Sequence, residues 1–213
     1  MGKYFGTDGF RGEANVTLTV EDAYKVGRFL GWYYGQKTKA DRCRVVIGKD
    51  TRRSSYMFEY SLVSGLTASG ADVYLLHVTT TPSVSYVVRT EEFDCGIMIS
   101  ASHNPYYDNG IKVINGKGEK LEEDVIVEIE RYLDGEMGEI PFALKDAIGR
   151  TTDYSAGRNR YIGYLISIAT RSFKGKKVAL DCANGSASAI AKNVFDALGA
   201  ETHVINNQPN GLN

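Results

Sequence analysis

The chain has 213 residues, of which 25 are basic and 26 are acidic, so its formal net charge is -1. Sequence-independent nucleic-acid surfaces need clustered Lys and Arg, and this balance argues against a nucleic-acid partner. Hydrophobic residues make up 43% of the chain, enough for a sizeable globular core. No apolar run approaches the ~18 residues that cross a membrane, so no membrane association is expected.

The N-terminus lacks the apolar segment of a secretory signal. The cysteines are odd in number and widely spaced, which predicts small buried side chains in a reducing compartment rather than disulfides: Cys43, Cys95 and Cys182. The three histidines are too scattered to indicate a zinc site. We therefore expect a cytoplasmic protein.

Apolar runs alternate with segments of helical periodicity. Thr19 and Asp22 resemble a capping box that opens a first helix, with Ala23, Val26, Leu30 and Tyr33 on its buried face. The elements predicted next, in chain order, are a strand at 44–48, a helix at 54–69, a strand at 72–78, a helix at 82–90, strands at 95–100 and 111–114, and an acidic helix at 121–133. Strands separated by helices predict an α/β fold whose sheet is mixed and largely parallel, with crossover helices.

A charged stretch at 134–153 has no clear periodicity and indicates a boundary between two units. We place residues 1–150 in a first domain and residues 151–213 in the beginning of a second. The elements expected in the second unit are a helix at 154–172, a strand at 177–181, a helix ending at 198 and a strand at 201–205. Two strands make a poor stand-alone sheet, so this second domain is predicted to be incomplete.

Two glycine-containing loops suit a phosphate ligand. Segment 6–12 places three glycines around a Thr, an Asp and an Arg; glycine lets backbone N–H groups approach a ligand, and Arg offers a planar fork to phosphate. Segment 48–55 lies between a strand and a helix, where α/β sheets bind anions. The alternatives are a simple turn with a solvated Arg in the first loop, and an ordinary helix cap at Ser54 or Ser55 in the second.

The loop at 100–112 carries the strongest prediction of a functional site. It follows an apolar strand and contains a hydroxyl, an imidazole, an amide, a carboxylate and an amine. Ser, Asn and Asp are also common in turns, but this density of reactive groups favours a site over a plain connection. The loop is not a Gly-x-Ser-x-Gly elbow. A further loop, 181–186, also joins a strand to a helix, and we interpret it as a helix cap through Ser186.

Three segments together resemble the α-D-phosphohexomutase superfamily: Gly6-Thr7-Asp8-Gly9-Phe10-Arg11-Gly12, Gly48-Lys49-Asp50-Thr51-Arg52 and Ser100-Ala101-Ser102-His103-Asn104-Pro105. Within it, the first segment and Asn109-Gly110-Ile111-Lys112 are most similar to the bacterial branch that acts on glucosamine phosphates. The resemblance continues through 181–185 to 209–213. It implies an isomerase of amino sugar metabolism, which interconverts glucosamine 6-phosphate and 1-phosphate for peptidoglycan precursors.

The resemblance also implies roles for individual residues. Ser102 would be carried as phosphoserine and would pass its phosphoryl group to the sugar, giving a bisphosphate intermediate; its phosphate would be a ligand of Mg²⁺. Arg11 and Lys112 would lie near the reacting group, with Lys112 a proton shuttle whose pKa a neighbouring cation depresses. His103 would be catalytic by organising the loop, a purely structural contact being the alternative. The phosphate-binding set implied is Thr7, Arg11, Lys49, Arg52 and Asn104.

The departures from the superfamily pattern are as informative as the matches. Its members are longer, and the Asp-Gly-Asp-x-Asp-Arg loop that supplies metal carboxylates is absent from this sequence. We therefore expect a fragment that is inactive alone, from an enzyme using one Mg²⁺ and a hexosamine 1,6-bisphosphate activator. The alternatives are a fragment of a mannose or glucose phosphate mutase, and a non-catalytic interaction fragment that forms homo-oligomers through an open sheet edge.

Overall fold

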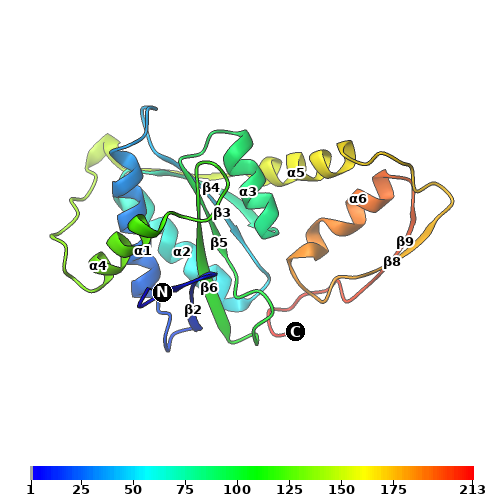
Figure 1. The fold of residues 1–213 in the computed structure, drawn as a ribbon, viewed down its shortest axis with the longest axis horizontal. Coiled ribbons are helices and arrows are strands. Elements are labelled where there is room, and N and C mark those ends of the chain that lie inside the picture. The colour runs from blue at the N-terminus through cyan, green and yellow to red at the C-terminus, as the bar shows by residue number, and fades with distance from the viewer. Residues whose placement is uncertain (1) are drawn as a thin grey trace.

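The computed structural model describes residues 2–213. A seven-stranded sheet covered by helices forms the larger part, and a smaller unit with two strands lies beside it (Figure 1). The sheet has the strand order β1-β2-β6-β5-β3-β4-β7. Its strands are β1 Phe5–Gly6, β2 Gly9–Glu13, β3 Arg44–Lys49, β4 Asp72–Val78, β5 Cys95–Ile99, β6 Asp108–Asn115 and β7 Thr151–Asp153.

The pairing within this sheet is mixed, which confirms the predicted α/β fold with a mixed sheet, but parallel pairs do not predominate as predicted. The three pairs β5-β3, β3-β4 and β4-β7 are parallel, and the three pairs β1-β2, β2-β6 and β6-β5 are antiparallel. Because β6 runs back beside β5, the loop that joins them lies at the carboxyl end of β5. The carboxyl end of β3 is adjacent, so the loops after β3 and β5 meet at one edge of the sheet.

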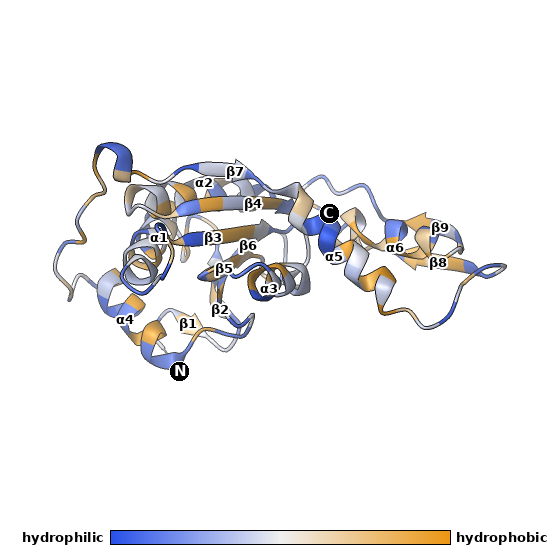
Figure 2. Cartoon of the chain, turned by 90° about the horizontal axis from the view of Figure 1, so that it is seen from above, coloured by the Kyte–Doolittle hydropathy of each residue, from blue (hydrophilic) through white to orange (hydrophobic). Residues whose placement is uncertain are grey.

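Helices cover both faces of the large sheet. They are α1 Val20–Gly35, α2 Arg53–Ala68, α3 Thr81–Thr90 and α4 Glu123–Leu133. Side chains of α1, α2 and α4 form one buried cluster with the sheet, whereas α3 packs against the opposite face in a second cluster. In Figure 2 the middle of the central strand β3 is hydrophobic, as burial on both faces requires.

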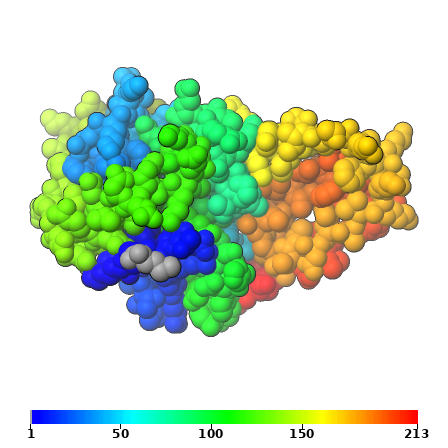
Figure 3. Space-filling model, viewed as in Figure 1, coloured from blue at the N-terminus to red at the C-terminus, as the bar shows by residue number. Residues whose placement is uncertain are grey.

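The smaller unit contains α5 Ser155–Ser167, β8 Lys177–Asp181, the short 3₁₀ helix η2 Ser186–Ala189, α6 Ala191–Ala197 and β9 Glu201–Ile205. Strands β8 and β9 pair in parallel. The unit lies against the larger one in the space-filling view (Figure 3). Tyr164 stacks on Tyr86 with ring centroids 4.6 Å apart, and the Thr51 hydroxyl donates to the Asn184 carbonyl at 3.0 Å. The domain division after residue 150 stays a prediction; β7, just beyond it, belongs to the large sheet.

Local sequence features account for several element ends. Thr19 and Asp22 form the predicted capping box of α1, and Pro82 lies in the first turn of α3. The three cysteines are free and buried, as predicted. Among residues 2–213, no helix has both the length and the apolar character needed to cross a membrane.

Other local predictions were wrong. Helix α2 is preceded by Arg52 and has no side-chain cap, so neither Ser54 nor Ser55 fills that role. Ser186 caps no α-helix either; it opens η2, and α6 begins after Ile190. Helix α5 ends at Ser167, short of the predicted residue 172. Ser55 donates to Asp50 instead, and Ser54 accepts from Asn109, and these contacts cannot be read from periodicity.

Candidate functional site

The β5–β6 loop, residues 100–107, presents one serine hydroxyl to solvent. Ser102 is exposed, and its backbone has a φ of 60°, a left-handed conformation that a non-glycine residue rarely adopts. Its N–H donates to the Oγ of the buried Ser100 at 3.0 Å. The Ser102 Oγ lies 3.4 Å from Nδ1 of His103. Strain of this kind collects at functional sites, where the surrounding contacts must hold it in place.

Ser102 borders an open cavity of about 720 Å³ between the two units. One wall consists of the serine loop, the β3–α2 connection and the first turn of α3, and Lys112 of β6 also reaches it. The other wall is formed by residues 183–186 and 211–213 of the smaller unit. The cavity therefore joins the loops that follow β3, β4, β5 and β8, which is where α/β sheets bind ligands.

Lys112 and Arg11 lie on the same face of the sheet. Arg11 of β2 pairs with Gly110 of β6, and Lys112 is two residues further along β6. Burial lowers the pKa of the Lys112 amine, and the nearby positive charge of Arg11 lowers it further. The predicted depression of this pKa is thus found, with desolvation as its larger cause.

Arg11 and Thr7 frame a second part of the surface. The Arg11 guanidinium pairs with Asp8, Nη2 to Oδ2 at 3.1 Å, while its buried Nε has no partner among residues 2–213. Thr7 lines a neighbouring hollow of about 490 Å³ rather than the cavity of Ser102. Lys112 borders both spaces, so it connects the two halves of the predicted site.

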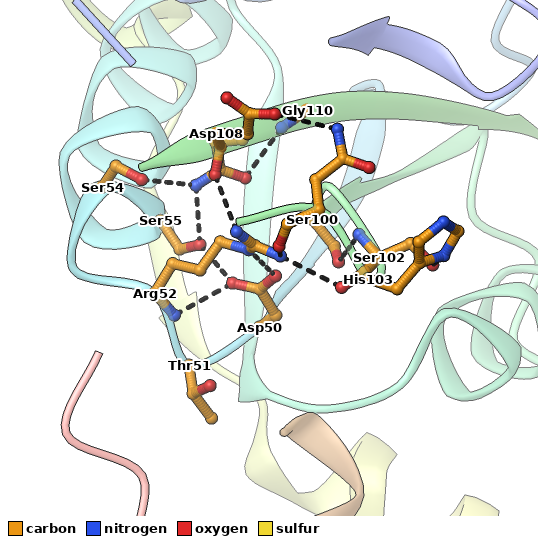
Figure 4. Close-up of polar contacts among 12 residues, drawn as sticks. Asp50, Thr51, Arg52, Ser54, Ser55, Ser100, Ser102, His103, Asp108 and Gly110 are labelled. Atoms are coloured by element: carbon orange, nitrogen blue, oxygen red, sulfur yellow. Dashed lines mark hydrogen bonds and ion pairs between the residues drawn. The ribbon is translucent and has the colours of Figure 1, made fainter. Parts of the chain in front are cut away.

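Two residues predicted to bind phosphate are held in internal contacts instead. The Lys49 side chain is 3% exposed, forms an ion pair with Glu59 and lies 4.2 Å from the ring centre of Tyr56. Arg52, 8% exposed, borders the cavity but directs its guanidinium into the serine loop (Figure 4). Lys49 is the last residue of β3 and Arg52 directly precedes α2, and the sequence pattern alone does not show which way their side chains turn.

Asn104 also acts within the loop. Its side-chain amide donates to Asp108 Oδ2 at 2.9 Å, and its backbone N–H donates to the Ala101 carbonyl at 3.2 Å. His103 is exposed at the cavity beside Ser102, away from the hydrogen bonds that fix the loop (Figure 4). The structure therefore brings Ser102, His103 and Lys112 to one cavity. Asn104 borders the same cavity, but its side-chain amide is engaged within the loop.

Sequence reasoning missed the buried polar residues beneath this loop. Asp50 and Asn109 are buried, and both contact Ser55. Asn109 is fully buried and also donates to Ser54 at 2.8 Å. All four residues stand in segments that the sequence analysis singled out, but their chemistry suggested exposed ligands or caps. Only the burial of Asp50 and Asn109 reveals a supporting network.

The residues of this chain do not fit a Mg²⁺ site by themselves. Within residues 2–213, no group of three or more His, Cys, Asp and Glu side chains could hold a metal ion. Both carboxylates under the serine loop are engaged: Asp50 accepts from Arg52 and Ser55, and Asp108 accepts from Asn104. Mg²⁺ prefers several oxygen ligands, and the exposed hydroxyl of Ser102 offers one.

The fold and the site together define an α/β/α domain with a polar, serine-bearing cavity at the carboxyl edge of its sheet. The family model described as "Phosphoglucomutase/phosphomannomutase, alpha/beta/alpha domain I" matches residues 2–138. The chain belongs to this family, as the superfamily resemblance predicted.

Curated relatives match along the whole chain. A phosphoglucosamine mutase of Lachnospira eligens is 74% identical, one of Lachnoclostridium phytofermentans is 76% identical, and one of Streptococcus pneumoniae is 49% identical, each over all 213 residues. The matched region is 47% of each relative. The chain therefore spans about half the length of the curated relatives it matches.

Solved structures show the same fold. A phosphoglucomutase/phosphomannomutase family protein of Burkholderia thailandensis superposes with a TM-score of 0.80 at 23% identity, over 98% of this chain and 44% of that one. A putative phosphomannomutase of Thermus thermophilus gives 0.79 at 25% identity, over 98% of this chain and 46% of that one. Both likenesses include the smaller unit, since nearly the whole chain is covered.

Proposed function

We propose that this chain is the phosphoryl-carrying part of a phosphoglucosamine mutase, which interconverts glucosamine 6-phosphate and glucosamine 1-phosphate. One observation carries the proposal: an exposed serine in a strained backbone conformation shares a cavity with a lysine of lowered pKa. The relatives of 74% and 76% identity bear the name phosphoglucosamine mutase, which supports glucosamine over other sugars.

Ser102 carries the phosphoryl group in this proposal. A hydroxyl oxygen of the sugar phosphate attacks the phosphorus on Ser102, a new P–O bond to the sugar forms, and the bond between phosphorus and Ser102 Oγ breaks. The product is a sugar bisphosphate. In the return step Ser102 Oγ attacks the phosphorus of the other phosphoryl group, and the bond from that phosphorus to the sugar oxygen breaks, which completes the isomerisation. Phosphoryl transfer needs positioning and charge neutralisation above all, and the cavity provides positive charge at Lys112.

In each transfer Lys112 takes the proton of the attacking hydroxyl and gives a proton to the oxygen that leaves phosphorus. An amine accepts a proton only in its neutral form, and the lowered pKa of Lys112 increases that fraction near neutral pH. Arg11 contributes to that lowering from outside the lining of the Ser102 cavity, with its guanidinium paired to Asp8. We assign no direct phosphate contact to four other residues. Thr7 lines a neighbouring hollow and Lys49 is paired with Glu59, while Arg52 and Asn104 border the cavity but use their side chains in hydrogen bonds within the fold.

The remaining parts of the proposal concern the longer enzyme. Because the residues described here do not form a Mg²⁺ site, no step of the reaction is assigned to the ion within this chain. Isolated, the chain is proposed to lack multiple-turnover mutase activity. The longer enzyme would work in the cytoplasm, with a hexosamine 1,6-bisphosphate as activator and a domain division near residue 150.

The experiment that tests the proposal is the intact mass of the chain after incubation with glucosamine 1,6-bisphosphate and Mg²⁺. A phosphoryl increment should map to Ser102 and be lost in Ser102→Ala. Ser186→Ala is the matched control, because Ser186 borders the same cavity from the smaller unit. An increment that persists in Ser102→Ala would contradict the assignment. Faster labelling by mannose or glucose 1,6-bisphosphate would favour the alternative substrate class.

A non-catalytic role through self-association is the second candidate. The observation that favours it is the two-stranded sheet of β8 and β9, which has no further strand on either edge within residues 2–213. Open edges recruit strands from other chains. Size-exclusion chromatography with light scattering measures the mass in solution, and a monomer at all concentrations would rule out this role.

A further inference from the structure

We propose that Arg52 is a positioning residue, which holds the serine loop in the conformation that presents Ser102, and is not a phosphate ligand. This inference rests on the proposed function only in taking Ser102 as the phosphoryl carrier. It assigns to Arg52 a role that the sequence pattern of a basic strand-to-helix loop does not suggest.

Every donor of the Arg52 guanidinium is already used. A guanidinium has five N–H groups. One, on Nε, donates to Asp50 Oδ2 at 2.9 Å. The other four meet backbone carbonyls of the serine loop and of Asp108, the first residue of β6. Nη1 donates to Pro105 and Asp108 (3.0 Å), and Nη2 donates to Ser102 (3.0 Å) and Asn104 (2.8 Å). A phosphate could bind Arg52 only by displacing these contacts.

The loop in turn depends on Arg52. Its own backbone makes few hydrogen bonds, among them Asn104 N–H to Ala101 and Asp108 N–H to Pro105. The carbonyls that converge on Arg52 belong to residues 102–108, so one side chain ties together both ends of the loop. Because the carbonyl of Ser102 is one of them, the contact bears directly on the residue with a φ of 60°.

Asp50 fixes the guanidinium in this position. It accepts from both the backbone N–H and the Nε of Arg52, and it also accepts from Ser55 Oγ at 2.6 Å. Asn109, at the start of β6, donates to the same Ser55 oxygen at 3.0 Å. The network therefore connects the end of β3, the first turn of α2 and the start of β6 around the serine loop (Figure 4).

A lysine could not replace Arg52 in this arrangement. Its ammonium is a point charge on a flexible chain and lacks the planar fork that reaches separate carbonyls. If Arg52 instead bound phosphate, a lysine at this position would keep part of the affinity for phosphate through its positive charge. The pair of variants Arg52→Ala and Arg52→Lys thus separates the two roles.

The experiment measures hydrogen–deuterium exchange in peptides covering residues 100–108 of the 213-residue chain, without sugar or phosphate. Arg52→Ala and Arg52→Lys should both speed exchange in this loop by about tenfold or more, because several charged hydrogen bonds are lost. The matched control is Arg53→Ala, an exposed neighbour with the same charge. Exchange in β5 reports whether each variant is folded, and the Lys variant keeps the test informative if the Ala variant unfolds.

Two further readouts distinguish positioning from ligand binding. The backbone chemical shifts of Ser102, which report its positive φ, should move toward extended values in both variants and stay in place in Arg53→Ala. Titration with inorganic phosphate should leave loop exchange fast in both variants. Unchanged loop exchange, with phosphate affinity lost in Arg52→Ala and kept in part in Arg52→Lys, would overturn the proposal. Since these readouts need no turnover, they stand apart from the phosphorylation test of Ser102.

Discussion

Two different effects lower the pKa of the Lys112 amine. Burial removes water from it, and Arg11 adds a like charge, and both lower its pKa. The register between β2 and β6 thus affects the pKa of one side chain. The pairing of Arg11 with Gly110 brings the Arg11 guanidinium to the face of the sheet that carries Lys112.

Arg11→Gln should raise the pKa of Lys112 toward the ordinary value of a lysine, since it removes the like charge and leaves most of the burial. The pKa is measured by NMR titration of the Lys112 ammonium. Arg131→Gln, an exposed arginine on α4, is the control and should have no effect. A Lys112 pKa that falls or stays unchanged in Arg11→Gln would show that burial alone lowers it.

At the scale of elements, a single carboxylate joins the N-terminal strand to α4. Glu130 accepts hydrogen bonds from the backbone N–H groups of Lys3, Tyr4 and Phe5. Burial by itself favours the protonated acid, but the three N–H donors outweigh it and the pKa of Glu130 is lowered. The stabilisation from a depressed acid pKa is present above its unfolded-state pKa and is lost as pH falls through the folded pKa.

Glu130→Gln should therefore lower the free energy of unfolding at pH 7, and the difference from the unsubstituted chain should shrink as the pH falls below about 4, near the ordinary range of a glutamate. Urea unfolding at pH 7, 5 and 3 measures this. Glu128→Gln, an exposed position on the same helix, is the control. A difference that is equal at all three pH values would mean that charge plays no part in the contact.

The crossing of α1 and α2 depends on two glycines. A Cβ on Gly65 would overlap the carbonyl oxygen of Tyr24, and one on Gly27 would overlap that of Leu62, so the helix backbones approach directly. Gly65→Ala should destabilise the chain by about 1–3 kcal/mol through overpacking. Gly163→Ala in α5, where a Cβ meets open space, should stabilise α5 by about 0.5–1 kcal/mol. Urea unfolding measures the free energy of unfolding of both variants. Equal changes in the two would contradict the close approach of the α1 and α2 backbones.

Periodicity predicted the elements that bury a regular apolar face, and it failed where polar contacts decide. The strands at 177–181 and 201–205 match their predicted bounds, because alternation and turn residues mark them. Strands β1, β2 and β7 were missed. β1 and β7 are only two and three residues long, and β2 contains two glycines and no alternation of apolar residues, so its pairing with β6 decides its conformation. The sequence contained no sign that Arg52 turns inward. A buried structural arginine and an arginine that binds phosphate look alike in a sequence, since both can occupy a loop between a strand and a helix.

At the scale of the whole molecule, an aromatic contact holds the smaller unit against the larger. Tyr164 of α5 stacks on Tyr86 of α3 with an angle of 23° between the rings. Tyr164→Ala should weaken this contact by about 0.5–1.5 kcal/mol and increase the radius of gyration in small-angle scattering. Ile168→Ala, at an exposed position just after α5, is the control. An unchanged radius in Tyr164→Ala would mean that other contacts suffice.

The cavity of Ser102 has one wall in each unit, so ligand binding is coupled to the relative position of the two units. A ligand that touches both walls binds more tightly when the two units lie together than when they lie apart. By linkage, occupancy must then shift the population toward closure, and any change that loosens the seam must weaken apparent affinity in proportion. The contact between α3 and α5 is therefore expected to tune the affinity of any ligand that touches both walls of the cavity.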